Sequence, residues 1–199
     1  ITILLNIFGT AVVAARGIAS TVANFVFNFV MNFQTAVRPQ IFKLYSISDT
    51  SNMNKLIMRT SRFSSYLMGL IGIPLFIEME TVLSIWLKDV PEYTCEFVRL
   101  ALIQGLIQAI DLPVGAGIHA VGKMRLPNVT SSLIYMAILP ISYFAIKMGA
   151  SPTITYIIIV CVYPLALFMD LYILHKYTRF PVQEFAGRNI ILPLLFIIA

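Results

Sequence analysis

The chain has 199 residues, of which 59% are hydrophobic and only 12% are charged, and its formal net charge is +5. A soluble domain carries about 25% charged residues, so this composition excludes an ordinary soluble globular protein. The ionisable residues lie in clusters between long apolar runs, which is typical of several membrane-spanning helices, because a helix satisfies its own backbone in lipid. The runs are too long and too evenly apolar for the strands of a membrane barrel.

The apolar runs predict an all-α, polytopic membrane bundle in residues 1–178, followed by a cytoplasmic segment and a truncated additional transmembrane helix in residues 179–199. The chain begins and ends inside apolar runs, so we interpret it as an excised part of a longer protein. The six expected spans lie at about 1–8, 14–36, 66–83, 94–120, 131–148 and 154–174.

Turn and breaker residues divide these spans. Gly9 is expected to end the first span, and residues 69–74, with two glycines and a proline, are expected to kink the third. The more polar residues 41–65 predict a separate helix at the membrane interface, with an N-cap among residues 49–51. The fourth span is expected to be interrupted at residues 111–113, Asp-Leu-Pro, because proline removes a backbone hydrogen bond.

The distribution of Lys and Arg gives the predicted bundle a direction. Alternate loops between the spans are rich in Lys and Arg and lie on one side of the membrane. The other side carries only Lys88, Arg99 and Lys147, with Arg16 just inside the membrane. The positive-inside rule places the richer side in the cytoplasm and explains much of the net charge, so we expect no nucleic-acid partner. The residues of the richer side are Arg38, Lys43, Lys55, Arg59, Arg62, Lys123, Arg125, Lys176, Arg179 and Arg188.

A polar stripe follows the second predicted span. Arg16, Ser20, Asn24, Asn28 and Asn32 recur every four residues and fall within an arc of about 160° on a helix. The stripe faces either a water-filled cavity or the polar groups of neighbouring helices, and the arginine could instead reach the outer interface. The opposite, lipid-facing side is expected to hold Val22, Phe25, Val26, Phe29, Val30 and Phe33.

A second polar face lies on the fourth predicted span. Gln104, Gln108 and Asp111 share an arc of about 60° on a helix, which indicates the wall of a cavity. Asp111, next to the expected interruption, is a candidate site for a cation, a proton or a conformational pivot, with a capped kink as the alternative. Asp170 could reach water or Lys176 at the cytoplasmic end of its span.

Motifs for catalysis are missing from the sequence. We find no nucleophile triad, phosphate-binding loop or metal-ligand spacing, and Cys95 and Cys161 lie far apart in predicted spans. We therefore expect a protein that is not an enzyme and that needs no cofactor.

Four stretches in order along the chain carry a family resemblance. They are Leu4–Ala19 (LLNIFGTAVVAARGIA), Asn32–Tyr45 (NFQTAVRPQIFKLY), Ser61–Leu100 (from SRFSSYLMGL to EYTCEFVRL) and Gly117–Asn128 (GIHAVGKMRLPN). Together they resemble the second half of the Wzx-like polysaccharide flippases, within the multidrug/oligosaccharidyl-lipid/polysaccharide exporter superfamily. The resemblance covers nearly the whole chain.

The resemblance implies two six-helix lobes that face each other across a central cavity, with this chain as the C-terminal lobe plus the start of an extra helix. It implies a flippase of the bacterial inner membrane that moves a polyprenyl-diphosphate-linked oligosaccharide by alternating access, together with a missing N-terminal lobe. Arg16 would attract the diphosphate, and Asp111 could couple transport to a cation or proton. Neutral hydrogen bonds to the sugar would come from Ser20, Asn24, Asn28, Asn32, Gln104 and Gln108.

Two other functions are open at this point. A multidrug or cation antiporter of the same fold would need a carboxylate for its cation, which Asp111 could supply. An integral-membrane glycosyl- or acyltransferase would need acidic or histidine groups clustered at one membrane face, and the sequence shows no such cluster.

Overall fold

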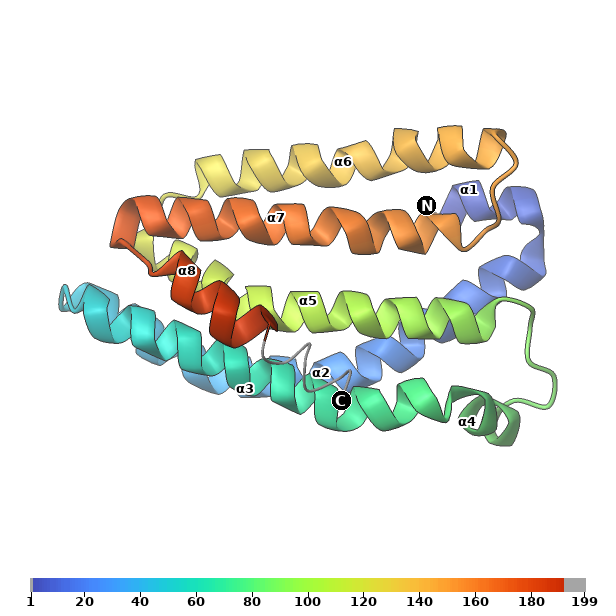
Figure 1. Ribbon diagram of the computed structural model, residues 1–199, viewed down its shortest axis with the longest axis horizontal. Helices are drawn as coiled ribbons and strands as arrows, with labels where there is room; N and C mark the ends of the chain where they lie inside the picture. The colour runs from blue at the N-terminus through green and yellow to red at the C-terminus, as the bar shows by residue number, and fades with distance from the viewer. Residues whose placement is uncertain (1, 192–199) are drawn as a thin grey trace.

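The computed structural model describes residues 2–191, and all regular secondary structure in this range is helical (Figure 1). The described range thus confirms the predicted all-helical class. A short 3-10 helix, η1, follows the first helix, and a π-helical turn, η2, ends the described range. The elements are α1 (Thr2–Leu5), η1 (Asn6–Phe8), α2 (Thr10–Ser46), α3 (Thr50–Ile77), α4 (Met79–Trp86), α5 (Thr94–Val121), α6 (Arg125–Lys147), α7 (Ile154–Thr178), α8 (Val182–Phe185) and η2 (Ala186–Ile191).

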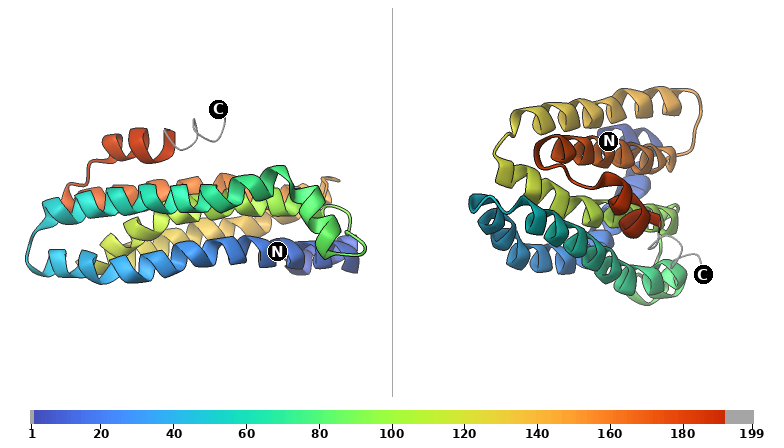
Figure 2. Two further views of the ribbon diagram at one scale, coloured as in Figure 1. Left: turned by 90° about the horizontal axis from the view of Figure 1, so that it is seen from below. Right: turned by 60° about the vertical axis from the view of Figure 1, so that its left-hand side comes forward.

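The long helices lie side by side along the long axis of the molecule, with α5 in the middle (Figures 1 and 2). Helix α5 packs against α2, α3 and α7, whereas α6 packs mainly against α7 at the edge of the bundle. Buried apolar residues are spread around α5, as expected for a helix that packs against several others. Helices α2, α5, α6 and α7 are each long and apolar enough to cross a membrane, and α3 with α4 forms a fifth candidate if the bent pair counts as one span.

Helix α2 is longer than predicted. It has 37 residues and continues through Pro39 to Ser46, beyond the expected end at residue 36. At 1.5 Å per residue it is about 55 Å long, compared with a bilayer core of about 30 Å. The carbonyl of Thr35, which loses its helical donor to the proline, belongs to an exposed residue near the Lys- and Arg-rich end, so α2 can continue without a buried backbone defect.

The prediction of a separate interfacial helix within residues 41–65 is wrong. Residues 50–77 instead form one helix, α3, whose predicted N-cap is confirmed: the Asn52 N–H donates to Asp49 Oδ1 at 3.1 Å. Helix α3 is continuous through the two glycines and Pro74 of the predicted kink, and a bend of 77° follows between α3 and α4.

The prediction of an interruption at residues 111–113 is wrong too, because α5 is continuous from Thr94 to Val121. Pro113 leaves the carbonyl of Ala109 without its helical N–H donor. The neighbouring carbonyl of Ile110 accepts a hydrogen bond at 2.6 Å from the buried Ser61 hydroxyl of α3. The packed α3 thus supplies a polar contact beside the proline, one residue from the carbonyl that loses its donor.

At the two ends of the chain, the described residues do not confirm the predicted six-helix lobe plus extra helix. Residues 2–8 form only α1 and η1, and the break at Gly9, with φ of +100°, is confirmed. Residues 179–191 fold back, and the Asn189 Nδ2 donates to the carbonyl of Met58 in α3 at 2.7 Å. The predicted additional transmembrane helix falls mostly on residues 192–199, outside the described residues.

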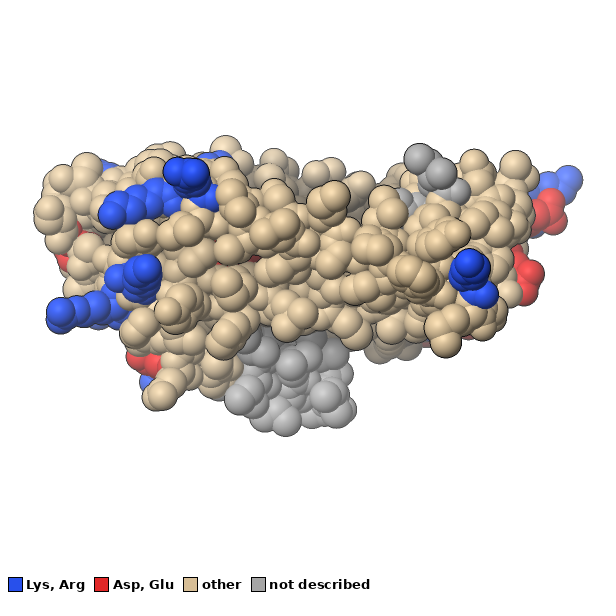
Figure 3. Space-filling model, turned by 90° about the horizontal axis from the view of Figure 1, so that it is seen from above, with Lys and Arg blue, Asp and Glu red and all other residues tan. Residues whose placement is uncertain are grey.

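Charged side chains separate along the molecule as a membrane protein requires. In the face shown in Figure 3, Lys and Arg gather at one end, where α2 turns into α3 and α7 ends. A wide middle belt is almost free of charge, and acidic and basic residues return at the opposite end. The belt matches the apolar helices, so we describe the chain as a multi-pass membrane protein.

Candidate functional site

Two adjoining hollows lie between α2, α5, α6 and α7. The smaller has a volume of about 100 Å³ and the larger about 270 Å³. They share three lining residues, Ser20, Gln104 and Tyr156, and we call them together the polar hollow. The other residues of its lining are Arg16, Ala23, Asn24, Phe27, Ala101, Gly105, Gln108, Tyr135, Ile138, Ile159 and Tyr163.

The packing of α2 determines which part of its polar stripe reaches the polar hollow. Small buried residues, Ala15, Ala19 and Ala23, form the contact seam of α2, because alanines let neighbouring helices approach closely. Arg16, Ser20 and Asn24 lie beside this seam and therefore line the hollow.

The last two residues of the predicted stripe do not reach the polar hollow. Each four-residue step rotates the stripe by about 40°, so Asn28 and Asn32 have turned away from the seam and are exposed outside both hollows. The predicted lipid face is partly wrong for the same reason: Val26 and Val30 are fully buried. Phe25 and Phe29 are exposed, as expected.

Arg16 brings a positive charge to the larger hollow. Its Nη1 donates to the Thr2 hydroxyl of α1, while its Nε is buried and has no acceptor among the described residues. A guanidinium carries five N–H donors and cannot lose its charge in proteins. Arg16 thus keeps donors for an anionic group at the hollow.

Helix α5 supplies the two glutamines of the predicted second polar face. Gln104 lines both hollows, and Gln108 lines the smaller one. The Gln108 Nε2 donates at 3.1 Å to the hydroxyl of Tyr163, which lines the larger hollow. Both amides offer donors and acceptors, so the structure brings Gln104 and Gln108 together with the first three residues of the stripe.

Three tyrosines of the polar hollow were not predicted. Tyr156 and Tyr163 come from α7 and Tyr135 from α6, and the rings of Tyr135 and Tyr163 lie 5.2 Å apart. The Tyr156 hydroxyl lies 3.5 Å from the Ser20 hydroxyl. A signal was available: Tyr156, Tyr163 and Asp170 are spaced by seven residues, which places them on one helix face.

The carboxylates of α5 and α7 lie outside the lining of the polar hollow. Asp111 and Asp170 each bury an Oδ1 atom that has no hydrogen-bond partner in the described part of the chain. The two helices that carry these residues pack together. Among residues 2–191 no ion pair joins Asp170 to Lys176.

These features define a class by architecture: a multi-pass helical membrane protein with a polar, tyrosine-rich hollow beside one buried arginine nitrogen. Comparisons do not narrow this class. No protein-family model matches the chain, and neither the curated proteins nor the solved structures include a significant match.

Proposed function

We propose that the chain is one lobe of a membrane transporter that moves a polyprenyl-diphosphate-linked oligosaccharide across the bacterial inner membrane by alternating access. The observation that carries the proposal is Arg16, a permanent cation with a buried, unpartnered N–H at the larger hollow. An opposing lobe, outside this chain, would complete the cavity. The sequence resemblance to polysaccharide flippases supports the same substrate class.

The residues of the polar hollow divide into two roles under this proposal. Arg16 attracts the diphosphate, because guanidinium and phosphate form strong, directional hydrogen bonds. The neutral side chains of Ser20, Asn24, Gln104 and Gln108 exchange hydrogen bonds with sugar hydroxyls without holding them by charge. The tyrosines present ring faces and hydroxyls to the same sugars.

The test is export of surface polysaccharide by full-length protein in cells that lack the native copy. Arg16→Ala should weaken substrate binding about tenfold or more, because a hydrogen bond to a charged group contributes about 1.5–3 kcal/mol. Arg16→Lys should restore part of the export because it keeps the charge. The matched control on the same helix is Thr21→Ala, since the exposed Thr21 hydroxyl bonds only to the Gly17 carbonyl of its own helix. Normal export by both Arg16 variants at normal protein levels would contradict the proposal.

A second candidate, a cation-coupled antiporter of the same fold, is favoured by the unpartnered carboxylate oxygens of Asp111 and Asp170. Buried oxygens without donors are costly unless a cation, a proton or water satisfies them. Asp111→Asn should therefore abolish ion-driven efflux of a cationic dye if the protein is an antiporter. Dye efflux that is unchanged by Asp111→Asn, or absent in the wild type, would argue against this candidate.

A further inference from the structure

An apolar groove lies between α3 and α5, on helix faces that the polar hollow does not use. It has a volume of about 390 Å³. Its wall on α3 includes Gly69, Gly72 and Phe76, and its wall on α5 includes Leu102, Ile103 and Leu106. From Met68, which also lines the groove, to Phe76 it extends about 12 Å along α3, enough for the upper part of an acyl chain.

The glycines keep this groove open. A Cβ atom built on Gly72 would meet no other heavy atom within 4 Å, and one on Gly69 would meet only the Ile73 Cδ1 at 3.5 Å. A larger side chain at position 72 would therefore project into free space and occupy the groove.

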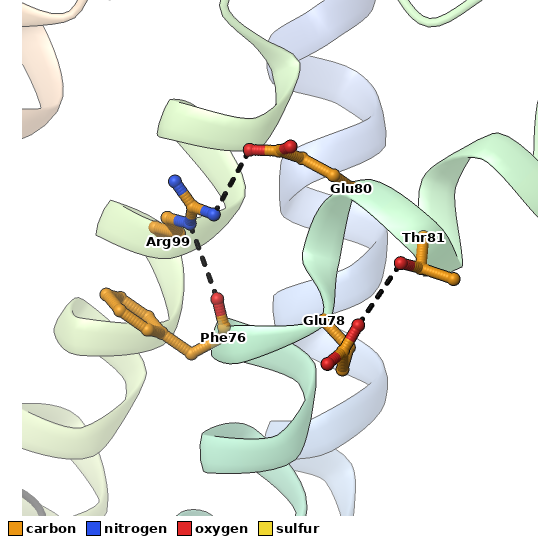
Figure 4. Close-up of polar contacts among 5 residues, drawn as sticks. All are labelled: Phe76, Glu78, Glu80, Thr81 and Arg99. Atoms are coloured by element: carbon orange, nitrogen blue, oxygen red, sulfur yellow. Dashed lines mark hydrogen bonds and ion pairs between the residues drawn. The ribbon is translucent and has the colours of Figure 1, made fainter.

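A charged pair stands at the outer end of the groove, where α3 ends and α4 turns away (Figure 4). Arg99 lies one helical turn before Ile103, on the same face of α5, so its side chain lies above the groove. Its Nε donates at 3.3 Å to the Phe76 carbonyl, close to the end of α3 at Ile77. Its Nη2 lies 3.4 Å from the Glu80 Oε1.

The ion pair between Arg99 and Glu80 is long and exposed to solvent. Charge-assisted N–H···O bonds are usually about 2.7–2.9 Å long, so a 3.4 Å separation is a weak contact that a ligand can replace. The Glu80 side chain is 76% exposed and that of Arg99 35% exposed, so both can contact a lipid headgroup. A second carboxylate, Glu78, accepts a hydrogen bond from the Thr81 hydroxyl nearby.

We propose that this groove is a selective site for phosphatidylethanolamine, with an acyl chain between α3 and α5, the phosphate on Arg99 and the ammonium on Glu80. The headgroup carries a negative and a positive charge in the order that the pair presents. Phosphatidylglycerol has no cation for Glu80 and Glu78. Phosphatidylcholine has a cation whose methyl groups replace the N–H donors.

The experiment is native mass spectrometry of the full-length protein in detergent, with phosphatidylethanolamine, phosphatidylglycerol or phosphatidylcholine of identical acyl chains. Wild type should retain phosphatidylethanolamine most strongly. Arg99→Gln should weaken its binding about tenfold, because a charge-assisted hydrogen bond is lost. Glu80→Gln should weaken it about two- to fivefold and reduce the preference over phosphatidylcholine, since an exposed ion pair contributes about 0.2–1 kcal/mol.

Gly72→Leu separates the groove from the headgroup contacts. It should remove the bound lipid of all three classes, because leucine fills the space of the acyl chain. The matched control is Gly17→Leu, on an exposed turn of α2 where an added Cβ also meets nothing within 4 Å. It should leave lipid binding unchanged.

Three results would overturn the site. The first is equal retention of the three lipids by wild type, and the second is unchanged retention by Gly72→Leu. The third is a wild type without bound lipid, which is how occupation of the groove by another part of the protein would appear. Because Glu80 is exposed, Glu80→Gln keeps the headgroup prediction testable if Arg99→Gln does not fold.

Discussion

Gly117 lies where α5 passes between α3 and α7, and a larger side chain there would crowd both helices. A Cβ atom would approach the Ile57 Cδ1 to 2.6 Å and the Leu174 Cδ1 to 3.2 Å, and both of these side chains are fully buried. Gly117→Ala should therefore destabilise the fold by about 1–3 kcal/mol relative to Gly115→Ala, because overpacking displaces buried neighbours. The measurement is thermal unfolding of both variants of the full-length protein in one detergent.

The control in this comparison shares the helix and the substitution. A Cβ atom added to Gly115 would meet no other heavy atom within 4 Å, so alanine there should gain about 0.5–1 kcal/mol of helix propensity. Equal melting temperatures for the two variants would show that Ile57 and Leu174 yield without cost.

Periodicity predicted part of the candidate site residue by residue. The four-residue spacing of Arg16, Ser20 and Asn24 placed them on one face, and the structure brings them to Gln104 and Gln108. A helical spacing fixes the direction of a side chain but not which neighbour covers it. The tyrosines were missed because aromatic residues are ordinary in apolar spans, and their value here comes from meeting the glutamines across three helices.

Helix α3 begins at a charged cap, and this predicts a pH effect. The Asn52 side-chain and backbone N–H groups donate to Asp49 and lower the pKa of its carboxyl below the ordinary value. A lowered pKa in the folded state stabilises the protein at neutral pH, and this contribution disappears as the pH falls through the lowered pKa. Asp49→Asn keeps a cap without the charge.

The melting temperature of wild type should exceed that of Asp49→Asn at about pH 7, and the difference should shrink toward about pH 3. Asp49→Ala should be less stable than Asp49→Asn at both values, because the side-chain cap itself is lost. A difference between wild type and Asp49→Asn that stays constant with pH would contradict the role of the carboxylate charge.

Elements were predictable in type but not in their limits. Long apolar runs indicated helices, and the structure has helices there. Proline was overrated as a breaker at positions 39 and 113, since α2 and α5 continue through these residues. Composition did not show that the polar residues 50–65 belong to the same helix as residues 66–77. Three polar residues of this segment, Ser61, Ser64 and Ser65, are buried against other helices.

At the scale of the whole molecule, the order and contacts of the helices were beyond periodicity. Helix α5 is central because three sides of it pack against other helices, α2, α3 and α7. Helix α6 is different, because most of its surface has no neighbour within the described residues. A bundle with one buried and one peripheral helix has an asymmetric surface, and the exposed face of α6 is apolar enough to lie against lipid.

The length of α2 has a mechanical consequence. About 55 Å of helix extends beyond a bilayer core of about 30 Å, and its last turns are tied to α3 by the fully buried Ile41, Met53 and Ile57. The two helices are therefore packed together at the Lys- and Arg-rich end. A tilt of α2 about the polar hollow would displace this end, among the lipid headgroups, farther than the hollow itself, because displacement grows with distance along a helix.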